Sequence, residues 1–324
     1  MDTKQYSMFD DIPEEFILPW ETEPDVAFGL WVKAARSPRG GFAYTPLSCT
    51  QFKSMWGQFT QFLRSRDSTV LNATPGLISA FLTQQKGVGQ SALAPVTIRR
   101  YLSLLSRVYE SLRKDQLCKM NPARELMKNN RQPLAPSVVA HLPASLDAQF
   151  IERASALPTG TWKQWRDKTM LLLLPGSGLT QTEVLRLTLA DLHLDEDVVY
   201  IEVPAHGLRD ARAVSLSPFA QVALQAWLEY RNEVGLATPE LFPAKVTGSA
   251  LNPSTLYRHI EALLTELGIT QQCGARRLRH TFALRQLQNG ASEKAVKDWL
   301  GLETDEMLGR YRRLVPNRFG VTAI

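Results

Sequence analysis

Three prolines lie close together near the middle of this 324-residue chain, at Pro133, Pro136 and Pro143. Proline lacks a backbone N–H and clashes with the preceding helical turn, so such a segment cannot continue a helix and forms an extended connection. We therefore predict a linker over residues 131–145, which divides the chain into two domains of ordinary size.

The part before this linker, residues 26–130, carries helical patterns. Apolar side chains recur at three- and four-residue steps over residues 50–64 and 96–112, which predicts two amphipathic helices. A third helix is expected over residues 74–84, where Pro75 suits a first helical turn. The first domain is therefore expected to be a helical bundle.

The part after the linker, residues 146–324, mixes helices with one short hairpin. Residues 198–203 and 212–216 are rich in β-branched side chains, which predicts two strands joined by a loop over residues 204–211. Helical patterns cover residues 146–156, 161–174, 181–189, 218–234, 252–267, 279–289, 291–300 and 305–314. The expected fold is therefore mainly α with a small β-hairpin.

The charge of the chain is concentrated rather than spread. The net charge is only +5, but residues 1–25 form an acidic tail of −7, residues 26–141 carry +12, and residues 142–324 are neutral. A dense positive charge suits a polyanion such as DNA or RNA, although a solvated helical surface rich in lysine and arginine is the alternative. The candidate phosphate contacts lie largely off the apolar face of the second helix, at Arg99, Arg100 and Arg107.

The three cysteines give no sign of a disulfide framework or a metal site. Cys49, Cys118 and Cys273 are far apart, with no Cys-x-x-Cys pair and no Cys/His cluster. We therefore expect no metal and no cofactor, and a reducing cytoplasmic location. If the polyanion is DNA, this location is at the nucleoid. The N-terminus lacks the pattern of a signal peptide, and the longest apolar run, residues 170–175, is too short to span a bilayer, so no membrane partner is expected.

Three segments of the second domain carry a set of motifs. They are Gly176-Ser177-Gly178-Leu179-Thr180-Gln181-Thr182-Glu183-Val184-Leu185-Arg186, Arg276-Arg277-Leu278-Arg279-His280-Thr281-Phe282-Ala283, and Trp299-Leu300-Gly301-Leu302 with Tyr311 after it. Together with the hairpin and with Asn121-Pro122-Ala123, they resemble the tyrosine recombinases, the family of phage integrases and Xer-type recombinases. The resemblance covers roughly residues 27–315. It implies a helical SAM-like core-binding domain over residues 26–130 and a tyrosine-recombinase catalytic-type domain over residues 146–324, which together clamp double-stranded DNA.

The resemblance also implies a chemistry that needs no cofactor. In this family a tyrosine attacks a DNA phosphodiester, forms a 3′-phosphotyrosyl link and releases a 5′-hydroxyl, so the bond energy is kept. Two arginines clamp the phosphate oxygens, because planar guanidinium groups bind phosphate through two hydrogen bonds. Carried over to the matching positions, Tyr311 is the expected nucleophile and Arg279 the second clamp arginine, beside His280 at a helix start.

Other catalytic positions of the family are changed in this chain. Thr180 stands where the first clamp arginine is expected, and a threonine hydroxyl offers one neutral hydrogen bond instead of a cation. Arg276 replaces the histidine that opens the His-x-x-Arg pattern, and Leu302 replaces a later histidine. Arg276 is therefore a candidate to supply the missing cation from another direction.

The lysine that this family carries on its hairpin, where it protonates the leaving oxygen, is also missing. No lysine occurs between Lys168 and Lys245. His206, Arg209 and Arg212 are the residues that could occupy its space. Arginine barely gives up its proton, so His206 is the better candidate for the acid, and Arg209 and Arg212 are assigned to DNA contact.

These changes leave three functional interpretations. The first is a DNA recombination or integration enzyme, from a mobile element, whose cleavage is impaired by the change at Thr180. The second is a non-catalytic accessory or regulatory DNA-binding paralogue, acting with a second copy or with an active recombinase. The third is a helical protein-interaction module with residues 1–25 as a docking tail. The residues after Tyr311 are expected to contact a neighbouring subunit or to cap their own domain.

Overall fold

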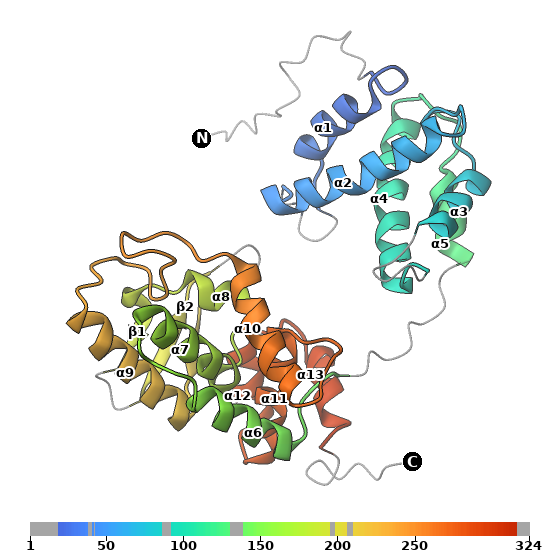
Figure 1. Ribbon diagram of the computed structural model, residues 1–324. Coiled ribbons are helices and arrows are strands. Elements are labelled where there is room, and N and C mark those ends of the chain that lie inside the picture. Colours follow the sequence, from blue (N-terminus) through green and yellow to red (C-terminus); the bar gives the residue numbers. More distant parts are fainter. Residues whose placement is uncertain are drawn as a thin grey trace, which may run out of the picture. The chain divides into compact units, whose positions relative to one another are not determined.

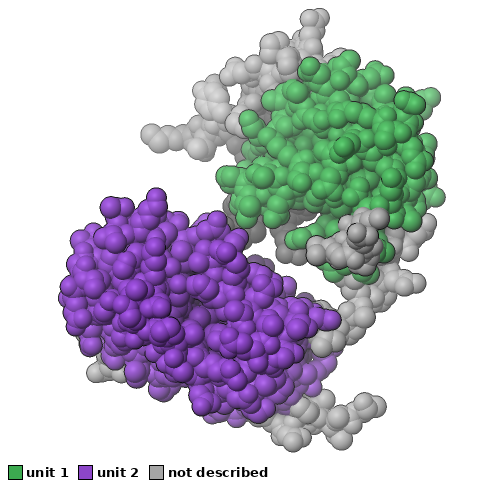
Figure 2. Space-filling model, viewed as in Figure 1, with its two compact units in different colours: residues 1–137 green, residues 138–324 purple. Residues whose placement is uncertain are grey.

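The computed structural model describes residues 19–37, 41, 43–85, 92–129, 139–194, 198–205 and 210–315. The chain divides into two compact units, residues 1–137 and 138–324 (Figure 2). Each unit has its own cluster of buried apolar side chains, as independent domains do. Residues 1–18 of the expected acidic tail and residues 131–138 of the expected linker lie outside the described residues.

The first unit contains five helices among its described residues (Figure 1). They are α1 (Pro24–Ala34), α2 (Pro46–Arg64), α3 (Pro75–Gln84), α4 (Pro95–Lys114) and α5 (Pro122–Asn129). Each begins with a proline, whose missing N–H costs nothing at a helix start, where backbone N–H groups have no helical partner. Threonine side chains cap two of them, because Thr45 accepts from the Ser48 N–H and Thr74 accepts from the Leu77 N–H.

Aromatic side chains fill the core of the first unit. The Trp56 ring stacks on Phe28 with centroids 4.7 Å apart and meets Trp20 edge-on at 5.8 Å. Trp20 is 2% exposed, and Asp25 pairs with Arg64 at 2.7 Å. The first unit therefore begins before residue 26 and includes the described end of the segment that was expected to be an acidic tail.

The second unit is mainly helical with one small sheet, which confirms the predicted fold class. Its elements are α6 (Ala144–Ser155), α7 (Trp162–Ser177), α8 (Gln181–Arg186), a 3₁₀ turn (Leu189–Asp191), β1 (Leu192–His193), β2 (Tyr200–Val203), β3 (Arg212–Ser215), α9 (Pro218–Glu233), α10 (Pro253–Glu266), α11 (Ala275–Gln288), α12 (Glu293–Leu300) and α13 (Asp305–Arg312). Helix α6 begins inside the expected linker, because Pro143 forms its N-cap, and Leu142 already lies in the core of this unit.

The sheet has three described strands, where the sequence predicted two. β2 lies in the middle and pairs antiparallel with both neighbours, with Ile201 opposite Leu192 of β1 and opposite Val214 of β3. β1 is only two residues long, which is too short for an alternating pattern to reveal. The predicted hairpin of β2 and β3 is present within this sheet.

Helix α7 forms the centre of the second unit and packs against α6, α8, α9, α10 and α11 (Figure 1). Its last turns are buried all round, as a central helix requires. At Gly176 a Cβ atom would lie 2.3 Å from the Cβ of Ala220 on α9, so only glycine allows this approach. The helix continues through Pro175 to Ser177, three residues beyond the predicted pattern, and Gly178 caps it in the left-handed conformation.

Candidate active site around Tyr311

Tyr311 lies inside the second unit, on α13. Its side chain is 1% exposed and belongs to a small apolar cluster that includes Phe282, Leu300 and Leu308. The Tyr311 Oη lies 2.7 Å from Nδ1 of His280 on α11. Two of the three motif segments therefore meet at this hydroxyl.

Arg279 joins the same two segments to the remaining one. Its Nη1 donates to the Gly178 carbonyl at 2.6 Å, and its Nη2 donates to the Leu300 carbonyl. Gly178 caps the C-terminus of α7 and Leu300 is the last residue of α12, so both carbonyls lack a helical partner and carry the negative end of a helix dipole. These carbonyls stabilise a guanidinium that is only 8% exposed.

The residue at the position of the missing arginine, Thr180, is the N-cap of α8. Its hydroxyl accepts from the Glu183 N–H at 3.3 Å, and the Glu183 carboxylate accepts from the Thr180 N–H at 2.7 Å. This reciprocal capping box satisfies two backbone donors at the helix start. The Thr180 hydroxyl therefore has a structural role in the helix cap.

Arg212, which is predicted to contact DNA, holds β3 against α8 and α12 in this structure. One guanidinium nitrogen lies 2.9 Å from the Glu183 carboxylate, and Nε donates to the Trp299 carbonyl at 2.9 Å. The side chains of Arg212 and Glu183 are both largely buried. Burial acts to raise the pKa of Glu183, but the Thr180 N–H, Arg212 and Arg279 outweigh it and hold that pKa below its usual value.

Tyr311 and His280 are both neutral at physiological pH. Burial, followed by the charges of Arg276, Arg310, Arg279 and His141, lowers the pKa of His280 to about 4. Burial also raises the pKa of Tyr311, against the opposing effect of the arginines. In the tautomer with Nδ1 unprotonated, the phenol O–H donates to the imidazole, which is the direction needed to move a proton off the tyrosine.

Two more arginines lie at this centre with very different exposure. Arg276 is exposed in the first turn of α11, and Arg310 is half-buried with its Cζ 5.8 Å from the centroid of the Tyr311 ring. Sequence reasoning found Arg276 but missed Arg310, because the residue before the tyrosine carries no pattern of its own. Leu302 is half-buried against the apolar cluster around Tyr311. His206 and Arg209 lie outside the described residues.

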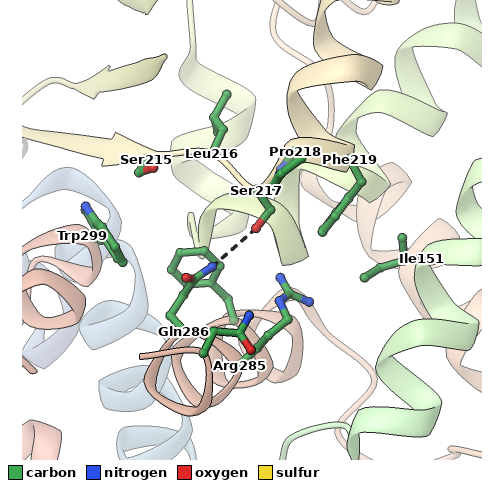
Figure 3. Close-up of a pocket in the computed structure, with 11 residues that line it drawn as sticks. Ile151, Ser215, Leu216, Ser217, Pro218, Phe219, Arg285, Gln286 and Trp299 are labelled. Carbon is green, nitrogen blue, oxygen red and sulfur yellow. Dashed lines mark hydrogen bonds between the residues drawn. The ribbon is translucent and has the colours of Figure 1, made fainter. Parts of the chain in front are cut away.

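A pocket of about 400 Å³ lies near the motif helices, lined by Phe282 and Trp299 among others (Figure 3). Its one cation, Arg285, pairs with Asp147 at 2.5 Å and donates to the Pro175 carbonyl, while lying over the Phe219 ring. Arg285 therefore ties α11 to α6 and α7, and the lining of this pocket includes none of the residues that the motifs predicted to be catalytic.

The arginines predicted to bind DNA in the first unit differ in their surroundings. Arg107 lies over the rings of Tyr44 and Phe52, at 5.2 and 5.0 Å, and donates to the Ser103 carbonyl. Arg100 is exposed. Arg99 lines a groove of about 520 Å³ formed by α4 and α5, whose complete lining is Arg99, Leu102, Ser103, Ser106, Arg124, Met127 and Lys128.

Metal-binding clusters and membrane-spanning helices are both absent from the described residues. No three or more His, Cys, Asp or Glu side chains among them are grouped to hold a metal ion. No helix in the described part is long and apolar enough to cross a membrane.

Comparison with known proteins gives relatives that are named as tyrosine recombinases. The tyrosine recombinase XerD of Lacticaseibacillus casei is 28% identical over 75% of this chain and 79% of its own length. The tyrosine recombinase XerC of Mesorhizobium japonicum is 27% identical over 89% of this chain and 90% of its own. These relatives confirm the family that the motif segments predicted.

Solved structures share the fold at lower sequence identity. The XerH recombinase in a post-cleavage complex with a palindromic difH substrate matches with a TM-score of 0.70 at 20% identity, over 91% of this chain and 82% of that one. A lambda integrase dimer bound to a COC′ core site matches with a TM-score of 0.60 at 16% identity, over 85% and 90%. The sequence model of the phage integrase family matches residues 145–318, which is more than half of the chain. The chain is therefore a member of the phage integrase family.

Proposed function

We propose that this protein binds double-stranded DNA and acts in site-specific recombination or integration, with Tyr311 as the nucleophile of a slowed strand cleavage. The observation that carries this proposal is the contact between the Tyr311 hydroxyl and His280, beside Arg279, whose guanidinium ties the ends of α7 and α12 to α11. The relatives named as tyrosine recombinases support the type of reaction.

The slowed rate follows from the residues at the changed positions. Thr180 supplies no cation for the negative charge of the transition state, and its hydroxyl already caps α8. Loss of a single electrostatic donor typically lowers an enzymatic rate by about 10²–10³-fold. Further losses in one site do not simply multiply, so a residual rate remains in the proposed mechanism.

The first unit would supply most of the affinity for DNA. Residues 26–141 carry a net charge of +12, and Arg99, Arg124 and Lys128 line one groove beside the exposed Arg100. Neutralised phosphates release their condensed counterions, so such binding is strong and insensitive to sequence. DNA-bound dimers among the structural relatives support self-association on DNA, and the cellular location would be that of the DNA.

A second function is favoured by the structural use of the Thr180 hydroxyl. In this alternative the protein is an accessory or regulatory subunit that binds a recombination site but cleaves no strand. It would act beside an active paralogue, which supplies the catalytic groups that this chain lacks.

The experiment that separates these functions begins by selecting bound sequences from a random duplex pool. A nicked suicide substrate carrying the selected site is then incubated with the full chain and with Tyr311→Phe. A covalent protein–DNA adduct that is lost in Tyr311→Phe supports cleavage. Tight site-specific binding without an adduct supports the accessory function.

A covalent adduct that persists in Tyr311→Phe would show that Tyr311 is not the nucleophile. Weak DNA binding that does not change with salt concentration would contradict DNA as the partner, because affinity for phosphates falls steeply as the salt concentration rises. That result would favour the protein-interaction module.

A further inference from the structure

Two arginines, Arg310 on α13 and Arg276 on α11, act electrostatically on Tyr311. Arg310 precedes it on α13, with its Cζ 5.8 Å from the Tyr311 ring centroid. Arg276 lies four residues before His280 on α11, so the two side chains share one face of that helix. Because His280 contacts the hydroxyl directly, Arg276 lies on the same side of the site.

The permanently charged groups that act on this pair are arginines. Arg310, Arg279 and Arg276 act on Tyr311, and the same three arginines with His141 act on His280. No carboxylate among the described residues is part of either set. Glu183 is a counter-ion for Arg279 and Arg212, so the excess positive charge at this centre comes from Arg276 and Arg310, and it favours the arrival of an anion.

The arginines at this centre differ in whether their donors are already used. The two terminal nitrogens of Arg279 donate to the Gly178 and Leu300 carbonyls. Arg310 donates only from Nε, to the Met307 carbonyl at 2.7 Å, among the residues that the structure describes. Within that same part of the chain, the guanidinium of Arg276 makes no hydrogen bond or ion pair. Arg279 has therefore committed both terminal nitrogens to backbone carbonyls, whereas the guanidinium of Arg276 and the terminal nitrogens of Arg310 make no hydrogen bond within the described part of the chain.

We propose that Arg276 and Arg310 form the phosphodiester-binding site at Tyr311, and that Arg310 supplies the cation that Thr180 does not. Planar guanidinium groups suit the non-bridging oxygens of a phosphodiester, which each can meet with two N–H donors. The first turn of α11 adds backbone N–H groups, since its N-cap Gly274 has no side chain to accept from them. This inference rests on the proposed function and assigns its phosphate contacts.

The test uses dimethyl phosphate, the smallest phosphodiester, and needs neither a cognate DNA site nor catalysis. Full-length protein with isotope-labelled histidine is titrated at pH 7.5, and the His280 imidazole resonances are identified by their absence in His280→Gln. The wild type should show a saturable shift. Arg310→Gln and Arg276→Gln should each weaken binding at least about tenfold, while Arg310→Lys should restore part of the affinity because it keeps the charge.

The matched control is Arg313→Gln, which removes an exposed arginine from the C-cap of the same helix. It should bind dimethyl phosphate as the wild type does, and all variants should keep the wild-type unfolding temperature. An Arg310→Gln protein with wild-type affinity would overturn the proposal. So would a wild type without a saturable shift, or an Arg313→Gln protein that weakens binding equally.

This result is independent of the test of the proposed function. Dimethyl phosphate has no sequence and no duplex, so its binding reports only on the arginines at Tyr311. If the protein binds dimethyl phosphate but forms no covalent adduct, the phosphate site is supported and the proposed cleavage is contradicted. If the wild type forms the adduct but Arg310→Gln binds dimethyl phosphate with wild-type affinity, cleavage is supported. The assignment of Arg310 to the phosphate site is then contradicted.

Discussion

The hydrogen bond between Tyr311 and His280 is the residue-scale feature that most depends on pH. The pKa of His280 in the folded protein, about 4, lies below the ordinary value of 6.5. As the pH falls, the unfolded chain therefore takes up a proton at this residue before the folded chain does. The protein thus loses stability as the pH falls from about 6.5 to about 4 and keeps it in full above this range.

We predict that the free energy of unfolding, measured by urea denaturation, decreases by up to about 3 kcal/mol across this pH range because of His280. His280→Gln should remove most of this pH dependence. His259→Gln, which replaces a half-exposed histidine beside Asp167, should keep it. Equal pH slopes for His280→Gln and the wild type would show that His280 has no depressed pKa.

The residues at this site differ in how far the sequence alone could find them. Tyr311, Arg279 and Thr180 were found because each occupies a fixed place in a motif. The ion pair of Arg212 with Glu183 was not found from the sequence. Glu183 lies on another element, and the pairing is set by the packing of β3 against α8. Arg310 was missed because the residue before the tyrosine carries no pattern of its own, and its place over the Tyr311 ring is set by the fold.

At the scale of elements, the end of α7 positions the site. Gly178 has a φ of 67°, and a Cβ atom there would lie 2.4 Å from the Phe282 ring. Its carbonyl accepts from Arg279, so any shift of this turn moves the guanidinium that joins the three segments. Glycine is therefore required here for its conformation and for its size.

We predict that Gly178→Ala is more destabilising than Gly235→Ala. Gly235 has nearly the same φ, 66°, but no atom within 4 Å of the added Cβ, so its replacement measures only the left-handed conformation, about 1–2 kcal/mol. Gly178→Ala should cost clearly more, because Phe282 must move. Urea denaturation of the two variants measures the difference. Equal losses would mean that Phe282 adapts without cost.

The elements themselves were mostly predictable, and their ends were not. Amphipathic patterns gave the long helices α2 and α4, where many turns repeat the same signal. The extension of α7 through Pro175 and the strand β1 were missed. The first depends on packing around one proline, and the second consists of two residues that are fixed only by pairing with β2.

At the scale of the whole molecule, charge and chemistry lie in different units. The basic excess belongs to the first unit, whereas Tyr311 lies in the second, which is nearly neutral by sequence. Arg107 is a weaker candidate for DNA contact than the other arginines of α4, because its guanidinium already packs on the rings of Tyr44 and Phe52. The groove between α4 and α5, lined by Arg99, Arg124 and Lys128, is the better place to test DNA binding.

We predict that joint replacement of Arg99, Arg124 and Lys128 by glutamine weakens DNA binding at every sequence and flattens its salt dependence. For each phosphate that is no longer neutralised, the slope of log K against log salt should fall by about 0.9. Fluorescence anisotropy with a labelled duplex at several salt concentrations measures both effects. The control protein replaces three exposed bases that do not line this groove, Lys33, Arg66 and Lys114.

The control protein has the same net charge as the groove variant, so a general reduction of charge affects both proteins equally. A larger decrease of affinity and slope in the groove variant would place phosphates at α4 and α5. Equal decreases would mean that DNA responds to the overall charge of the first unit, and the groove would then have no special role. Either outcome leaves the phosphate site at Tyr311 untouched, because that site lies in the other unit and is measured with dimethyl phosphate.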